Sequence, residues 1–296
     1  MEPMTKTFTY KVAEGCAIKA DVHEAGGNSS RSRAAVVFIH GGCLMMGSRV
    51  GHELLIDLLT GAGYPVISID YRLAPETKLE PIIEDVVDAI TWVRREGPSL
   101  FRVDPDRIAV MGESAGGYLT LMSGFAVSPP PKALVSFYGY GDIDGAWYSK
   151  PDPFYRRQPL VDRSAARSSV GTRVMSEVPR SHTRRLFYLY CRQNGLWPEE
   201  VSGHSPDSER TWFDRFCPVR NVTNRYPATL LLHGDIDTDV PYEQSRAMAR
   251  KLESFGVDHE LVTVPGRGHG FDDPGFSDPV SAAALDRILP FLARHV

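Results

Sequence analysis

The chain has 296 residues, with 33 Lys and Arg against 37 Asp and Glu, 42% hydrophobic residues and 24% charged residues. This is the composition of a globular protein, and the length suits one large α/β domain or two small ones. The net charge of −4 argues against a nucleic-acid-binding protein, which carries a strong basic excess. No apolar run approaches the roughly 18 residues that a membrane-spanning helix needs, so we do not expect the chain to be an integral membrane protein.

The N-terminal residues and the cysteines indicate a cytoplasmic location. The start MEPMTKTFTYKVAEG lacks the apolar core of a secretory signal peptide. The four cysteines are widely spaced without a CxxC pair, and so predict neither a disulfide framework nor a zinc site; they are Cys16, Cys43, Cys191 and Cys217. We expect reduced thiols.

Eight short runs predict β-strands. The first two alternate between polar and apolar residues, as half-exposed strands do, and lie at 7–12 and 17–23. The other six are continuously apolar, as strands covered on both faces are; they lie at 34–39, 65–70, 107–112, 133–138, 228–233 and 259–264. Helical patterns lie between them, near 52–61, 80–96, 115–126, 242–255 and 279–294. This alternation predicts an α/β fold with a mostly parallel eight-stranded sheet flanked by helices.

One interval, 141–225, breaks the alternation, because it has no clear strand and is rich in Pro, Arg and aromatic residues. Structureless loops of this length are uncommon in compact domains. We therefore expect a helical cap inserted after the sixth strand, with 1–140 and 226–296 forming the core. Residues 150–192 hold ten Lys or Arg against three Asp or Glu, which suits a solvated helix face or a basic lid that steers an anionic substrate.

The most informative segment is GESAG at 112–116, which follows a predicted strand and precedes a predicted helix. Gly112 and Gly116 allow a sharp turn where a Cβ would collide with neighbouring backbone. Such a turn exposes the hydroxyl of Ser114 at a helix N-terminus, where the helix dipole stabilises negative charge. The alternative is a Gly/Ser turn that only packs the helix.

A serine nucleophile needs a histidine base and an orienting carboxylate, in the chain order Ser, acid, His. His269 lies in a Gly-flanked loop after the last predicted strand, whereas His40 and His233 end strands and are more typical of backbone-organising residues. The acid is left open among three residues after the strand 228–233: Asp235, Asp237 and Asp239.

The intermediate of acyl transfer also needs backbone N–H donors for its oxyanion. The segment HGGC at 40–43 opens from a buried strand into two glycines that permit close approach of a ligand. The N–H of Ala115, directly after the serine, is a further donor. A plain strand-end turn is the alternative interpretation of HGG.

Together these motifs resemble the hormone-sensitive-lipase-like esterases of the α/β-hydrolase superfamily. The resemblance covers about 34–140 and 226–296, and its motifs are HGGC at 40–43, DYRLAPE at 70–76, DPDRIAVMGESAGG at 104–117 and HGF at 269–271. A fifth motif, HGDIDTDVP at 233–241, is similar to the acid loop of dipeptidyl-peptidase-like hydrolases.

The resemblance implies an α/β-hydrolase fold with Ser114 as nucleophile, His269 as general base and acid, and Asp237 as the orienting acid. It implies that the oxyanion donors are the amides of Gly42, Cys43 and Ala115, and that residues 71–76 brace the site. Two features depart from the family pattern: Cys43 replaces its third glycine, and the cap follows the sixth strand instead of the N-terminus. A nucleophilic Cys43 is the alternative, although it has no basic neighbour in sequence.

We expect a serine hydrolase that cleaves a carboxylic ester of a small to medium molecule through an acyl-enzyme, with no cofactor or metal. An amide or peptide hydrolase is the alternative within enzymes, because the same triad serves both reactions. A small-molecule receptor is the alternative outside them. The expected partner is the small-molecule substrate, with neither nucleic acid nor membrane, and the oligomeric state is not predicted.

Overall fold

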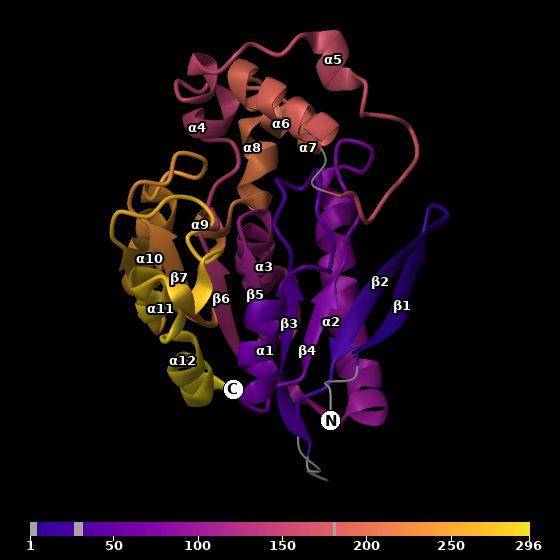
Figure 1. The fold of residues 1–296 in the computed structure, drawn as a ribbon, viewed down its shortest axis with the longest axis vertical. Coiled ribbons are helices and arrows are strands. Elements are labelled where there is room, and N and C mark those ends of the chain that lie inside the picture. Colours follow the sequence, from indigo (N-terminus) through magenta and orange to yellow (C-terminus); the bar gives the residue numbers. More distant parts are fainter. Residues whose placement is uncertain (1–4, 27–31, 180–181) are drawn as a thin grey trace.

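The computed structural model describes residues 5–26, 32–179 and 182–296. Within these ranges no helix combines the length and the apolar character needed to cross a membrane. The architecture is a central sheet with helices on both faces and a group of short helices beyond one end of the strands (Figure 1).

The sheet has eight strands in the order β1-β2-β4-β3-β5-β6-β7-β8. The pairs β1–β2 and β2–β4 are antiparallel, and the remaining neighbours are parallel. All eight predicted strands and the mostly parallel eight-stranded α/β sheet are confirmed. The strands are β1 (Thr5–Ala13), β2 (Cys16–His23), β3 (Arg33–Ile39), β4 (Val66–Ile69), β5 (Val103–Glu113), β6 (Ala133–Phe137), β7 (Ala228–Gly234) and β8 (His259–Val264).

Two hydrophobic clusters cover the two faces of the sheet. Successive residues of β3 alternate between them, with Val37 in one cluster and Val36 and Phe38 in the other. This alternation is why the parallel strands are continuously apolar. The first face packs against α2 (Leu79–Phe101), α3 (Ala115–Ala126) and α10 (Glu243–Ser254); the second packs against α1 (Glu53–Gly61), α11 (Pro279–Leu285) and α12 (Ile288–His295).

The helix predicted near 279–294 is two helices in the structure, interrupted at Asp286 and Arg287. Pro290 explains the break, because a proline in a helix interior removes a backbone hydrogen bond and clashes with the carbonyl four residues earlier. With the interruption, Pro290 falls in the first turn of α12, where a proline is tolerated. The helix predicted near 80–96 is longer in the structure, where α2 ends at Phe101.

Between β6 and β7 the described residues form short helices and no named strand. They lie beyond the carboxyl ends of the parallel strands, with α4 to α7 in the part of the molecule farthest from both termini (Figure 1). The elements are α4 (Ala146–Ser149), η1 (Tyr155–Arg157), α5 (Arg163–Arg167), α6 (His182–Asn194), α7 (Trp197–Ser202), α8 (Arg210–Phe213), η2 (Asp214–Phe216) and α9 (Pro218–Asn221).

Candidate active site

Ser114 lies on a sharp turn between β5 and α3. Its backbone has φ 52° and ψ −117°, a strained conformation for a residue with a side chain. The turn is possible because glycines flank it: a Cβ on Gly112 would lie 2.4 Å from the carbonyl oxygen of Gly116, and one on Gly116 would lie 2.0 Å from that of Ile39. The Ser114 amide donates a 2.9 Å hydrogen bond to the Phe137 carbonyl, which fixes the turn against β6.

The structure brings Ser114, His269 and Asp237 together. His269 Nε2 is 3.0 Å from Ser114 Oγ, and His269 Nδ1 is 2.8 Å from Asp237 Oδ2. Asp237 Oδ1 accepts hydrogen bonds from the backbone amides of Asp239 and Val240, at 2.8 and 3.0 Å. The carboxylate is thus held at both oxygens while it contacts the imidazole.

The surroundings shift the pKa values of the acid and the histidine in opposite directions. Burial alone would raise the pKa of Asp237, but contacts with His233 and His269 bring it well below its ordinary value. For His269, burial opposes the charged imidazole, yet the carboxylates of Asp239 and Asp237 raise its pKa to about 9. Asp237 therefore stays ionised beside His269.

The other two candidate acids have different contacts. Asp235 Oδ1 accepts a hydrogen bond from the amide of Gly266, at 2.7 Å. Asp239 has one oxygen 3.6 Å from His269 Nε2, on the side of the ring that faces Ser114. Only Asp237 contacts His269 Nδ1 among the described side chains.

The two competing histidines at strand ends organise the backbone. His233 contacts Ser245 Oγ at 2.7 Å and the Val240 carbonyl at 3.0 Å, so it supports the loop that carries the acid. His40 lies 2.6 Å from the Gly41 carbonyl and stacks on Tyr71, with ring centroids 4.4 Å apart.

The predicted oxyanion donors lie in two segments beside Ser114. Gly42 has φ 113°, and a Cβ there would lie 2.0 Å from the Met46 carbonyl oxygen, so only glycine fits. Cys43 follows in the left-handed region with φ 60°. Ala115 is the first residue of α3, so no carbonyl within the helix can accept its N–H. Gly42, Cys43 and Ser114 all line one cavity.

That cavity has a volume of about 270 Å³. Its floor comes from the sheet side, with Ser114, Tyr138 and His269. Its opposite wall is formed by the segment between β6 and β7. The residues there are Tyr155 in η1, Gln158 directly after η1, and Arg185, Tyr188 and Leu189 in α6. A reacting group at Ser114 is therefore enclosed between the sheet and these helices.

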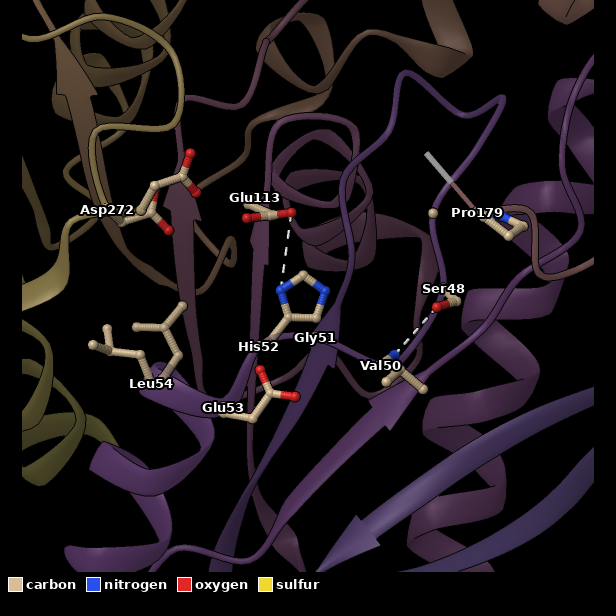
Figure 2. Close-up of a pocket in the computed structure, with 12 residues that line it drawn as sticks. Ser48, Val50, Gly51, His52, Glu53, Leu54, Glu113, Pro179 and Asp272 are labelled. Carbon is tan, nitrogen blue, oxygen red and sulfur yellow. Dashed lines mark hydrogen bonds and ion pairs between the residues drawn. The ribbon is translucent and has the colours of Figure 1, made fainter. Parts of the chain in front are cut away.

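Figure 2 shows a second, larger cavity, with a volume of about 460 Å³. The two cavities share Glu113 and Asp273 as wall residues. In Figure 2, His52 points toward Glu113, and Leu54 and Asp272 lie on the opposite side of the cavity from Ser48. His52 Nδ1 is 4.0 Å from Glu113 Oε1.

A buried cluster that the sequence does not predict supports His269. The hydroxyl of Tyr138 donates to Asp272 Oδ1 at 2.6 Å and lies 3.4 Å from Glu113 Oε2, and its ring lies 4.5 Å from that of His269. Burial and the neighbouring Glu113 raise the pKa of Asp272. The available signal was the position of Glu113, directly before the serine.

Most of the described Lys and Arg residues of 150–192 are exposed, as a solvated face requires, but two arginines are buried. Arg184 and Arg192, each 1% exposed, pair with carboxylates: Arg184 with Glu76 at 3.0 Å, and Arg192 with Asp239 at 2.7 Å and Asp152 at 2.6 Å. Buried charges need such partners, which explains why these arginines point inward. Arg185, in contrast, is exposed at the wall of the Ser114 cavity.

The described residues contain no group of three or more His, Cys, Asp or Glu side chains that could hold a metal ion. All four cysteines are free thiols. Cys43 lines the cavity, but the imidazole of His269 is hydrogen-bonded to Ser114.

Comparison with known proteins confirms the α/β-hydrolase fold class that the sequence predicts. A family model for the alpha/beta hydrolase fold matches residues 36–273. Among curated proteins, the chain is 28% identical over its whole length to the non-reducing polyketide synthase pkbA of Emericella nidulans, and 26% identical over 98% of its length to the non-reducing polyketide synthase adrD of Penicillium roqueforti. In each case the chain spans only 14% of the relative.

Solved structures share the fold. A protein of unknown function from Staphylococcus aureus aligns with a TM-score of 0.78 at 21% identity, covering 99% of both chains. An alpha/beta hydrolase superfamily protein from Enterococcus faecalis has a TM-score of 0.75 at 20% identity and the same coverage. A thermophilic esterase from Thermogutta terrifontis has a TM-score of 0.70 at 22% identity, covering 98% of this chain and 92% of the other.

Proposed function

This chain belongs to the alpha/beta hydrolase fold family, and from that premise we propose that it is a serine hydrolase of the carboxylesterase type. Its substrate is a carboxylic ester of a small to medium organic molecule. The observation that carries the proposal is the hydrogen-bonded series from Ser114 through His269 to Asp237, at 3.0 and 2.8 Å. A nucleophile, a base and an orienting acid within contact distance are the minimum for acyl transfer.

In the proposed reaction, Ser114 Oγ attacks the ester carbonyl carbon while its proton moves to His269 Nε2. Asp237 at Nδ1 orients the ring and stabilises the imidazolium. The tetrahedral intermediate then collapses, the carbon–oxygen bond to the alcohol breaks, and the alcohol leaves with the proton from Nε2. A water molecule then attacks the acyl-enzyme carbonyl and gives a proton to His269 Nε2. The bond between the acyl carbon and Ser114 Oγ breaks, the carboxylic acid leaves, and Ser114 Oγ takes the proton from Nε2.

We assign the oxyanion to the backbone amides of Gly42, Cys43 and Ala115. Three features support this assignment: the left-handed backbone at Gly42 and Cys43, the cavity they share with Ser114, and the N–H of Ala115 at the start of α3, which no carbonyl within the helix can accept. Fixed N–H donors of this kind are worth about 3–4 kcal/mol in the transition state.

We further propose that residues 141–225 act as a cap, which supplies the far wall of the Ser114 cavity. Tyr155, Tyr188 and Leu189 give that wall an aromatic and apolar surface. We assign one half of the ester to this cavity and the other half to the adjoining cavity, because Glu113 and Asp273 border both.

The aromatic wall favours an aryl acyl group over a plain alkyl one. The proposal includes the hormone-sensitive-lipase-like grouping and the small-molecule partner, which rest on sequence motifs. It also includes a cytoplasmic location, which the four free cysteines favour.

The test is turnover of nitrophenyl esters from acetyl to decanoyl, together with the benzoyl ester, by the wild type and Ser114→Ala. We expect the wild type to cleave esters and the variant to lose several orders of magnitude in kcat. Preference for the benzoyl over the hexanoyl ester supports the aryl assignment. A wild type that cleaves no ester of the series but cleaves the matched anilides would instead make the chain an amide hydrolase.

A further inference from the structure

His269 has a carboxylate at each end of its ring. Asp237 Oδ2 contacts Nδ1 at 2.8 Å, the position expected of an orienting acid. Asp239 Oδ2 lies 3.6 Å from Nε2, the nitrogen that also contacts Ser114 Oγ. The reaction derived above uses Asp237 and gives Asp239 no part, so this second carboxylate needs its own explanation.

Asp239 is held in place through its other oxygen. Oδ1 accepts hydrogen bonds from the hydroxyls of Tyr155 and Tyr188, at 2.8 and 2.5 Å, and from Arg192 Nη1 at 2.7 Å. Arg192 also donates to the Asp239 carbonyl at 2.9 Å. With Oδ1 and the backbone both engaged, the carboxylate cannot turn freely, and Oδ2 stays directed at the imidazole.

All three donors come from the segment between β6 and β7, whereas Asp239 belongs to the loop after β7. Arg192 is itself anchored to Asp152 at 2.6 Å, and its guanidinium lies over the rings of Tyr148 and Tyr155, 4.8 and 4.7 Å from their centroids. The position of Asp239 beside His269 therefore depends on this segment being seated on the sheet.

We propose that Asp239 is a positioning residue that stabilises the protonated imidazole of His269 from the Nε2 side, in an arrangement fixed by Tyr155, Tyr188 and Arg192. The inference rests on the proposed serine hydrolase function, because it concerns the base of that reaction. The imidazolium forms each time Ser114 gives up its proton, and a carboxylate about 4 Å away lowers its free energy.

Other groups around His269 also bear on its charge. Burial disfavours the imidazolium, while Asp239, Asp237 and Glu113 favour it, and together they raise the pKa of His269 to about 9. The positive charge of Arg192 is offset by Asp152 as well as by Asp239. The remaining titratable or charged groups that border the cavity are Cys43, Tyr138, Tyr155, Arg185, Tyr188 and Asp273.

The direct test is the NMR titration of the His269 imidazole in the wild type, Asp239→Asn and Asp239→Glu. Asparagine keeps an oxygen for the tyrosine and arginine donors but removes the charge, so we expect the pKa of His269 to fall by about 1 or more. Glutamate keeps the charge, and we expect a midpoint nearer to that of the wild type. In a profile of kcat/KM against pH, the midpoint on the acid side should shift to lower pH in Asp239→Asn and not in Asp239→Glu.

An unchanged His269 midpoint in Asp239→Asn contradicts the inference, and so does an equal fall in the Asn and Glu variants, which is the signature of lost packing. If the Asn variant does not fold, Tyr155→Phe takes its place. This variant removes one hydrogen-bond donor from Asp239 Oδ1, so the negative charge of Asp239 is less compensated. We therefore expect the pKa of His269 to rise. A fall in that pKa, or no change, overturns the inference. The titration needs no turnover, so it is separate from the test of ester hydrolysis.

Discussion

The indole Nε1 of Trp197 donates a 3.0 Å hydrogen bond to the carbonyl oxygen of Cys43. This bond joins α7, in the segment between β6 and β7, to the loop after β3, across 154 positions of the sequence. Trp197 is fully buried and stacks on Tyr148 with ring centroids 4.0 Å apart. The proposed cap and the proposed oxyanion loop are therefore coupled through one side chain.

Replacing this tryptophan by phenylalanine should loosen the oxyanion loop. Trp197→Phe removes the indole donor of the Cys43 carbonyl, and the loss of one hydrogen bond costs about 0.5–1.5 kcal/mol. We expect a lower unfolding temperature and a fall in kcat larger than any change in KM. Trp212→Phe is the matched control, because its ring packs on His204 and Phe216; equal losses of kcat in both variants would contradict the coupling.

The pKa of His269 predicts an alkaline activity profile. The base must be neutral to accept the Ser114 proton, and the folded protein raises the pKa of His269 from 6.5 to about 9. Below that value the neutral fraction falls about tenfold per pH unit, and kcat/KM should fall with it. The measurement is kcat/KM from pH 6 to 10 at constant ionic strength. A plateau that already begins at pH 7 would show that the base is not held in its charged form.

The turn at Ser114 should not tolerate a methyl group. In Gly116→Ala the new Cβ would lie 2.0 Å from the Ile39 carbonyl, within the hydrogen-bonded strand β3, so the backbone must shift. We expect a loss of about 1–3 kcal/mol or more in the free energy of unfolding, and lost activity. Gly61→Ala, at the end of α1, meets no atom within 4 Å and is the control. The measurement is denaturant unfolding of Gly116→Ala and Gly61→Ala. Similar unfolding midpoints for the two variants would contradict the prediction.

Removing one partner of the buried pair Glu76–Arg184 should destabilise the protein far more than breaking an exposed pair. The side chains of Glu76 and Arg184 are 0% and 1% exposed, and Glu76→Gln leaves the guanidinium buried without its charge partner. We expect a loss of about 3–5 kcal/mol. For Glu96→Gln, in the exposed pair with Arg95, we expect less than about 1 kcal/mol. Chemical denaturation measures both; losses of equal size would contradict the assignment.

The sheet could be predicted because its signal is local. A strand buried on both faces is largely apolar, and β3 to β7 carry that pattern within a few residues. The run 259–264 was expected to be covered on both faces as well, but β8 lies at the edge of the sheet and is only partly buried. The turn at Ser114 is equally local, since Gly112 and Gly116 stand within two residues of the serine. The break between α11 and α12 at 286–287 was not predicted, because the helical pattern of apolar residues continues through Pro290.

The choice of acid and the surroundings of His269 depend on the fold. Spacing leaves Asp235, Asp237 and Asp239 equivalent, and the family resemblance selected the one that contacts His269 Nδ1. The role of Asp239 at the other nitrogen had no sequence signal. Its donors lie 47 to 84 positions away, and buried arginines cannot be told from surface ones by composition.

The same reason hid the cluster of Glu113, Tyr138 and Asp272. Its members come from the ends of β5 and β6 and from the loop after β8, and they are 25 and 134 positions apart. Only the register of the sheet brings them together.

The central claim is that Ser114 forms the acyl-enzyme. The most direct measurement is intact-protein and peptide mass spectrometry after treatment of the wild type, Ser114→Ala and Cys43→Ser with a fluorophosphonate. We predict one adduct on the peptide that contains Ser114, in the wild type and Cys43→Ser and not in Ser114→Ala. An adduct on Cys43, or labelling that survives in Ser114→Ala, would contradict the account.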